Sequence, residues 1–245
     1  MSSPDKAIAR LNVLLTQYRR GEGNYLKQTS STGASWADYK DGSIIPKEIS
    51  RGKLLEDAKD LETNLENFFV RIMAWGFGPA GYAHYRTNRI LSELNTVDGR
   101  TINGWMNGLR SQSKLSPSDA FAYLESKGGK IKFLGPAFAT KVLYFLSPVG
   151  NRAPILDSVV VSWLWRYSIA SKKHLITLEF ANRDGYKRYI DFVDKALDQL
   201  SNLLTQSSDE NDRGFIEYLM FQDQLAYQLD FGLENWMRRA DLKPS

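Results

Sequence analysis

Apolar residues recur every three or four positions along almost the whole chain, and this spacing limits the possible folds more than any other feature. Such periodicity predicts amphipathic helices, whereas the two-residue alternation that is typical of strands is almost absent. The segments with helical spacing are residues 5–19, 54–75, 82–94, 101–109, 117–127, 137–146, 158–167, 184–204 and 213–229. We therefore expect an all-α fold.

The composition is that of a globular protein, with 42% hydrophobic and 12% aromatic residues in 245 positions. This is enough to bury the core of a single domain spanning residues 1–245. The net charge of +4 permits binding to nucleic acid without requiring it. The chain has no cysteine and only two histidines, so we expect no metal and no cofactor. Because no signal-peptide core and no membrane-length apolar run is present, we expect a cytoplasmic protein.

Two segments interrupt the helical pattern. Residues 24–50 are rich in Ser, Thr, Gly and Asp, which predicts a long loop that either contacts a ligand or is a plain surface excursion. Residues 76–81, Gly-Phe-Gly-Pro-Ala-Gly, end one helix before the next begins. They lack the Lys-Ser/Thr ending of a nucleotide-binding loop. A close approach to a ligand, a wedge into duplex DNA and a sharp turn between packed helices all remain open.

The segment from residue 127 to residue 163 carries the strongest functional signal. No acidic residue occurs between Glu125 and Asp157, while the following basic residues do: Lys127, Lys130, Lys132, Lys141 and Arg152. Gly135-Pro136 ends one segment and starts a helix, because proline restricts both itself and the residue before it. Unpaired N–H groups at a helix start bind phosphate. We therefore expect a phosphate to bind beside this turn.

Two side chains at helix starts are candidates for chemistry. Lys141 lies in the helix predicted at residues 137–146, and Asp157 precedes a helix that is apolar on nearly every face. Asp157 is placed as an N-cap, and that role alone would explain it. Lys141 is equally explained as a solvated helix lysine. If its amine is instead partly buried, it can attack a carbon atom as a nucleophile.

The predicted elements follow one another in a recognisable order: a helix, a hairpin, a helix that carries a lysine, a turn, an aspartate and a further helix. This order resembles the helix-hairpin-helix superfamily of DNA glycosylases, in particular the lysine-bearing 8-oxoguanine branch. The helix-hairpin-helix unit covers about residues 117–146. The segment Pro136–Lys141 matches the end of that family's motif, Leu-Pro-Gly-Val-Gly-Thr-Lys. Asp157 matches the family's aspartate and Pro154 lies in the turn before it. The aspartate follows the lysine by 16 residues, a few fewer than is usual in that branch.

The chain departs from the family at the hairpin, where Ala137 and Ala139 replace two glycines. Alanine still offers its N–H group but is strained at positive φ, so we expect an altered hairpin and doubt that a cation binds there. The absence of cysteine excludes the iron–sulfur cluster of some relatives.

The resemblance implies a helical bundle with an interhelical cleft, and a partner that is double-stranded DNA containing a modified base. A nucleotide would leave the duplex, Lys141 would attack its C1′ atom, and Asp157 would position the attacker and stabilise the charged sugar. Strand cleavage could follow. The backbone of the DNA would contact Lys130, Lys132, Gly135, Ala137, Ala139 and Thr140. The base would lie between Phe221, Gln222, Trp75 and Trp163. We expect a monomer.

Three alternatives remain open. The protein could be a non-catalytic helix-hairpin-helix DNA-binding module. It could be a monofunctional glycosylase, in which Asp157 activates water and Lys141 only positions. The base could be an oxidised guanine, as the resembled branch implies, or a bulky hypermodified base of viral DNA, which would make the protein a defence enzyme.

Overall fold

The computed structural model describes residues 3–20, 28–32, 36, 45–61, 64–97, 101–170, 182–204 and 213–226. The helices are α1 (Ser3–Arg20), α2 (Arg51–Asp57), the short 3₁₀ helix η4 (Ala58–Asp60), α3 (Leu65–Phe77), α4 (Ala83–Val97), α5 (Ile102–Ser113), α6 (Pro117–Glu125), α7 (Pro136–Leu146), α8 (Ser158–Arg166) and α9 (Arg183–Leu204). A further helix occupies residues 213–226. The fold is all-α, as predicted.

The predicted single helix over residues 54–75 is wrong. The chain instead forms α2 and η4, turns at Leu61, and begins α3 after Asn64. The side chain of Asn64 accepts a hydrogen bond from the backbone N–H of Asn67 and so caps the new helix. Apolar periodicity continues across this break, which explains why the spacing alone did not reveal it.

Within the predicted loop, two short strands form an antiparallel pair. Strand β1 (Thr29–Ser31) pairs with β2 (Glu48–Ser50), with Ser30 opposite Ile49. Ser50 then caps α2 by accepting from the N–H of Lys53. The remainder of the loop lies outside the described residues, as do residues 227–229 at the end of the last predicted helix.

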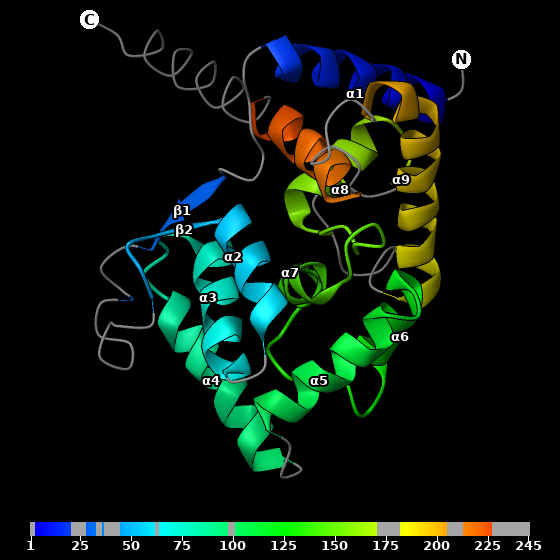
Figure 1. The fold of residues 1–245 in the computed structure, drawn as a ribbon. Coiled ribbons are helices and arrows are strands. Elements are labelled where there is room, and N and C mark those ends of the chain that lie inside the picture. The colour runs from blue at the N-terminus through cyan, green and yellow to red at the C-terminus, as the bar shows by residue number, and fades with distance from the viewer. Residues whose placement is uncertain are drawn as a thin grey trace, which may run out of the picture.

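Helix α7 lies at the centre of the molecule, between a group formed by α2, α3 and α4 and a second group that includes α6 and α9 (Figure 1). All eight of its residues from Ala139 to Leu146 are buried. It packs against α3, α5 and α6, while α9 packs against α6 and α1. Close packing around a buried helix holds its side chains in fixed directions. The direction of the Lys141 side chain, which α7 carries, is therefore fixed by its surroundings.

The turn between α6 and α7 is held by close backbone contacts. The indole N–H of Trp105 donates to the carbonyl oxygen of Gly129 at 2.6 Å. A Cβ atom at Gly129 would lie 1.8 Å from the carbonyl oxygen of Tyr123, so a glycine is needed there. Phe133 has a φ of 71°, in the left-handed region, and its ring lies 3.7 Å from the guanidinium of Arg89.

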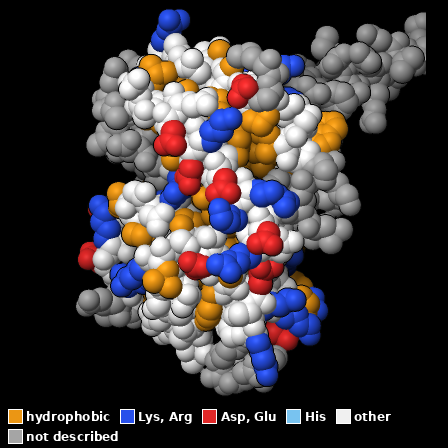
Figure 2. Space-filling model, turned by 90° about the vertical axis from the view of Figure 1, so that its right-hand side faces the viewer, with side chains coloured by type: hydrophobic (Ala, Val, Ile, Leu, Met, Phe, Trp, Pro, Cys, Tyr) orange, Lys and Arg blue, Asp and Glu red, His pale blue; other side chains and the backbone are white. Residues whose placement is uncertain are grey.

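The face formed by α9 and its neighbours carries intermingled acidic and basic side chains, as Figure 2 shows. Several of them pair, for example Lys187 with Asp191 and Arg213 with Asp194. Such a mixed face does not present the single sign of charge that attracts a phosphate backbone. Among the described helices, none combines the length and the apolar composition that a membrane crossing requires.

Candidate functional site

Lys141 and Asp157 lie side by side. Lys141 is on α7 and Asp157 is the N-cap residue of α8, and the distance from Lys141 Nζ to Asp157 Oδ2 is 3.1 Å. Their side chains are 10% and 15% exposed, so the pair is mostly shielded but reachable. The sequence left open whether Asp157 is a helix cap or a functional carboxylate. The geometry is compatible with both roles, because the residue caps α8 and also faces Lys141.

The two carboxylate oxygens of Asp157 have different partners. Oδ1 accepts from the N–H groups of Val159 and Val160, both at 3.1 Å, and so caps α8. Oδ2 faces Lys141 Nζ. Because the cap fixes the plane of the carboxylate, the oxygen that faces the amine is held in place.

The segment before Asp157 is anchored by hydrogen bonds to α7 and α9. Thr140 Oγ1 accepts from the N–H of Leu156 at 3.1 Å. Tyr186 and Tyr189 of α9 donate their hydroxyl protons to the carbonyl oxygens of residues 154 and 155, at 2.7 and 3.0 Å. Asp157 therefore enters α8 from a segment that is tied to both α7 and α9.

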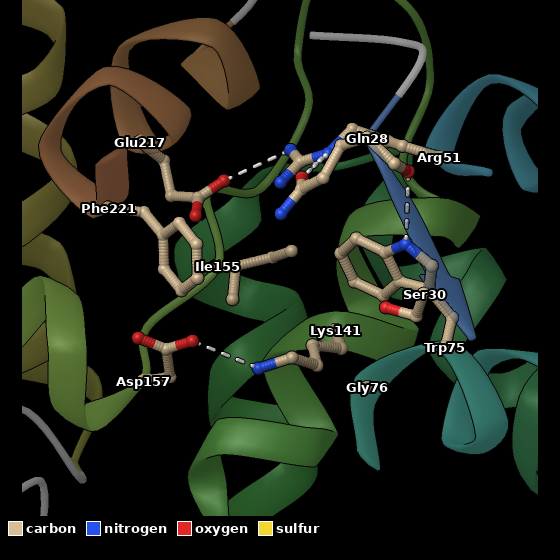
Figure 3. A pocket seen from close by; sticks show the side chains of 10 residues that line it. All are labelled: Gln28, Ser30, Arg51, Trp75, Gly76, Lys141, Ile155, Asp157, Glu217 and Phe221. Carbon is tan, nitrogen blue, oxygen red and sulfur yellow. Dashed lines mark hydrogen bonds and ion pairs between the residues drawn. The ribbon is translucent and has the colours of Figure 1, made fainter. Parts of the chain in front are cut away.

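A cavity of about 120 Å³ borders the pair. Figure 3 shows the side chains that converge on it from both ends of the chain. It is lined by Gln28, Ser30, Arg51, Trp75, Gly76, Lys141, Ile155, Asp157, Glu217 and Phe221. A cavity of about 150 Å³ accepts a benzene molecule, so the space is on the scale of one aromatic ring.

Gly76, in the last turn of α3, allows α7 to approach. A Cβ atom at this position would lie 2.9 Å from Phe138 Cε1 and 3.0 Å from Lys141 Cδ. Both contacts are shorter than carbon atoms normally make, so a larger residue here would have to displace the Phe138 ring and the stem of Lys141.

Opposite the lysine–aspartate pair lies a second, more deeply buried ion pair. Arg51, the first residue of α2, donates from Nη1 to Glu217 Oε2 at 3.1 Å, and both side chains are almost fully buried. Arg51 Nε also donates to Gln28 Oε1 at 2.9 Å. The guanidinium lies 5.1–5.5 Å from the ring centroids of Trp75, Tyr144 and Tyr218.

Burial raises the pKa of the Glu217 carboxyl to about 7 from its ordinary value of 4.5. Desolvation is the largest cause, and the positive charge of Arg51 opposes it. The negative charge of Asp157 adds to the rise in the pKa of Glu217, whereas the positive charge of Lys141 counteracts it. The two ion pairs therefore act on each other through the cavity.

The predicted base pocket is partly corrected. Trp75 and Phe221 line the cavity. Trp163 does not, because it is fully buried and its indole N–H donates to Asp223 Oδ2 at 2.8 Å. Gln222 is partly buried on the same helix as Phe221 but is not part of the cavity wall. Trp163 and Gln222, which were predicted to hold the base, therefore do not line this cavity.

The predicted phosphate contacts also divide into two groups. Gly135 caps α7 without a side-chain hydrogen bond, and no partner for its N–H or for that of Ala137 is found among the described residues. By contrast, the N–H of Ala139 donates to the Gly135 carbonyl, and Thr140 is fully buried. The Ala139 N–H and the Thr140 side chain are therefore already engaged within the protein. The replacement of glycine by alanine causes no strain, since Ala137 and Ala139 are both helical.

The two predicted basic contacts flank the turn differently. Lys132 is 66% exposed, with its amine 3.4 Å from Glu93 and 5.1 Å from the Phe133 ring. Lys130 is exposed at the rim of a second cavity of about 210 Å³, to which Ala139 also contributes. Both lysines remain accessible to a ligand at the surface.

An aromatic and basic surface connects this turn with the cavity. The rings of Phe77 and Phe138 lie 4.0 Å apart, and Lys141 Nζ lies 5.5 Å from the Phe138 ring. Arg86 covers Phe77 at 5.8 Å. Next to Phe77, the ring of Tyr82 is 56% exposed. The residues after the glycine-rich break thus border the same site as the hairpin.

The cavity residues Arg51, Ile155 and Glu217 were not predicted from the sequence, and Gln28, Ser30 and Gly76 belong to segments for which ligand contact was only one of the open readings. One signal was present. Glu217 is an acid between two apolar residues of a helix, one turn before Phe221, where the helical pattern predicts an inward-facing side chain. Arg51 gave no such signal, because its burial depends on a partner 166 residues away. Among the described residues, no group of His, Cys, Asp or Glu side chains is arranged to hold a metal ion.

Comparison with known proteins supplies the family. A family model described as "Putative 8-oxoguanine DNA glycosylase OGG-like protein" matches residues 20–221. No curated protein and no solved structure matches the chain. The matched range covers well over half of the sequence and contains both ion pairs of the cavity. The family predicted from the hairpin motif is thus confirmed, and the chain belongs to the 8-oxoguanine DNA glycosylase OGG-like family.

Proposed function

We propose that this protein is a DNA glycosylase that extrudes a modified nucleotide from duplex DNA and releases its base, with Lys141 as the nucleophile. The observation that carries the proposal is the 3.1 Å contact between Lys141 Nζ and Asp157 Oδ2 at the wall of a cavity. Family membership supports it. A base inside a duplex is shielded by stacking, so the reaction requires a pocket for a flipped base.

The chemistry begins with a proton transfer from the Lys141 ammonium to Asp157 Oδ2. The free amine attacks C1′ of the extruded nucleotide, the C1′–N bond to the base breaks, and the base leaves with the bonding electrons and takes a proton. The sugar ring then opens between C1′ and O4′, O4′ gains a proton, and C1′ forms an imine with Nζ. Asp157 returns the proton to the departing base and, as a carboxylate again, stabilises the positive charge that develops on the sugar.

Strand cleavage follows from the imine. A proton moves from C2′ to the Asp157 carboxylate as the 3′-phosphate departs, which constitutes β-elimination, and hydrolysis of the imine restores Lys141. This lyase step uses no side chain beyond those already placed at the cavity.

The DNA backbone docks on the turn between α6 and α7. The N–H groups of Gly135 and Ala137 point from the positive end of the α7 dipole, where a phosphate binds. Lys130 and Lys132 add positive charge beside them. Across the surface, Arg86 supplies a further contact, and the exposed ring of Tyr82 is placed to stack on a base.

The test is capture of the covalent intermediate. The protein is incubated with duplex DNA that contains 8-oxoguanine, with borohydride present to reduce the imine. The wild-type protein should form a cross-link to DNA, and the Lys141→Gln variant should form none. Lys187→Gln is the matched control, because Lys187 lies on the mixed-charge face and pairs only with Asp191 among the described residues.

The other outcomes separate the alternatives. Base release without a cross-link, retained by Lys141→Gln and lost by Asp157→Asn, would identify a monofunctional glycosylase. Binding without base release from any substrate would identify a DNA-binding module. Mass analysis of bases released from oxidised DNA and from hypermodified viral DNA distinguishes a repair enzyme from a defence enzyme.

A further inference from the structure

We propose that Arg89 is a positioning residue, which holds the turn before α7 in the conformation that presents its backbone N–H groups to a DNA phosphate. The inference rests on the proposed function, in which the DNA backbone docks at this turn. Arg89 acts on the turn through the ring of Phe133 and makes no contact with the DNA in this role. It thereby links helix α4 to the DNA-binding end of α7.

The first observation is the backbone conformation of Phe133. The N–H of Leu134 donates to the carbonyl oxygen of Ile131 at 3.3 Å, so residues 131–134 form a β-turn. Phe133 is the third residue of this turn and has a φ of 71°. A bulky residue rarely adopts this left-handed conformation, in which glycine or asparagine is usual. Such a conformation persists only where contacts with the surrounding structure favour it.

The second observation is the contact that favours this conformation. The central guanidinium carbon of Arg89 lies 3.7 Å from the centre of the Phe133 ring, which is a stacking distance. On the next turn of α4, Glu93 pairs with the amine of Lys132 at 3.4 Å. Two successive residues of the turn are thus held by two residues that are neighbours on the surface of one helix.

The third observation is the alignment of these contacts along α4. Arg86, Arg89 and Glu93 follow one another at spacings of three and four residues, so they lie on one face of the helix. Arg86 covers the ring of Phe77, which packs on Phe138 of α7 beside the cavity. The same face of α4 therefore borders both the cavity and the turn before α7. Loss of the Arg89 contact would loosen the turn while the cavity end of this face stays in place.

The strength of one exposed contact between a cation and a ring sets the size of the expected effect. Such a contact shifts the population of a local conformation by a few-fold. If the N–H groups of Gly135 and Ala137 reach a phosphate only from the closed turn, the apparent affinity falls with the fraction of molecules in which the turn is closed. The bound complex keeps the same contacts, so the rate of chemistry within it does not change.

The experiment measures binding to a duplex that carries a tetrahydrofuran abasic analogue, which lacks the C1′ hydroxyl and cannot form an imine. Arg89→Ala should weaken binding by roughly three- to fivefold. Phe133→Gly removes the ring together with the strain, so this variant should bind within about twofold of the wild-type protein. In the Phe133→Gly background, Arg89→Ala should change the affinity by less than about 1.5-fold, because the ring through which Arg89 acts is absent. The control is Arg20→Ala, which removes an exposed arginine at the end of α1, far from α4 in Figure 1, and should not change binding.

Salt dependence separates positioning from direct contact with the DNA. Each phosphate contact contributes about 0.9 to the slope of log affinity against log salt concentration. Arg89→Ala should keep the slope within about 0.3 of the wild-type value, whereas Lys130→Gln should lower it by about 0.9. With protein in saturating excess over a duplex that contains a natural abasic site, borohydride should trap Arg89→Ala at the wild-type rate.

Several results would overturn the inference. Arg89 would contact the DNA itself if Arg89→Ala weakened binding equally with and without the Phe133 ring, or lowered the salt slope by about 0.9. Binding of Arg89→Ala with wild-type affinity would show that the turn does not need the contact, and slower trapping at saturation would show that Arg89 affects the chemistry instead.

The remaining outcomes separate this inference from the proposed function. An unchanged salt slope for Lys130→Gln would place the DNA elsewhere, and the role of Arg89 would fall with the docking site. Failure of borohydride to trap the wild-type protein would contradict the role of Lys141 as nucleophile. The binding comparison between Arg89→Ala and Phe133→Gly would still decide the role of Arg89, because the tetrahydrofuran duplex requires no chemistry.

Discussion

Replacing Glu217 by glutamine removes the charge of a fully buried carboxyl and keeps its shape. Burial raises the pKa of Glu217 to about 7 from an ordinary value of 4.5. Below about pH 4.5 the side chain is neutral in the folded and the unfolded chain, so its titration does not affect stability. Between about pH 4.5 and 7 the unfolded chain releases the proton first, which favours unfolding. The stability that depends on the neutral carboxyl is therefore lost as the pH rises through this window.

The size of the effect follows from the pKa. Each pH unit corresponds to about 1.4 kcal/mol, so the wild-type protein should lose on the order of 3 kcal/mol relative to the Glu217→Gln variant between pH 4 and pH 8. This loss of stability on ionisation of Glu217 is the opposite of what is usually expected when a carboxyl forms an ion pair. Desolvation of the carboxylate exceeds the attraction of Arg51, and neutral replacements of buried pairs are often stabilising for this reason.

The assay is urea unfolding followed by tryptophan fluorescence, with the difference in free energy of unfolding between the two proteins plotted against pH. Taking the difference cancels the other titrating groups. Glu48→Gln is the control, because Glu48 is an exposed carboxyl on β2. A difference that stayed constant within about 0.5 kcal/mol from pH 4 to pH 8 would refute the reasoning. A difference in free energy of unfolding that shifted in favour of the wild-type protein as the pH rose would also refute it.

Three further substitutions test the site and its support. Gly76→Ala would place a Cβ atom 2.9 Å from the nearest ring atom of α7, so borohydride trapping should slow by about tenfold or more; Gly81→Ala, which meets open space, should leave it unchanged. Gly129→Ala would place a Cβ atom 1.8 Å from a carbonyl oxygen of α6 and should lower the free energy of unfolding by roughly 3 kcal/mol or more. Gly128→Ala, with no atom closer than 3.9 Å, should cost less than about 1 kcal/mol in the same urea titration. Asp157→Asn retains the oxygen that caps α8, so the free energy of unfolding should change by less than about 1 kcal/mol. The rate of base release should fall by roughly 10²–10⁴-fold. A loss of activity that is fully explained by a loss of stability would show that the residue is only a cap.

The sequence by itself determined the features that depend on residues close to one another along the chain. The helix start at Asp157 was predicted from its capping side chain, which accepts the expected backbone N–H bonds. The family and the lysine–aspartate pair followed from motif spacing, because the turn between α7 and α8 brings residues 16 positions apart into contact. These features are encoded within a few helical turns.

Only the tertiary structure decided which buried side chains border a cavity. Helical periodicity identifies an inward face but does not say whether that face meets another side chain or an open space. Trp163 and Phe221 have the same apolar pattern, yet the first packs fully against Asp223 and the second lines the cavity. Arg51 and Glu217 are 166 residues apart and acquire their ion pair only when α2 packs against the C-terminal helix. Charge, burial and access at the site thus come from long-range packing, which a local pattern in the sequence does not record.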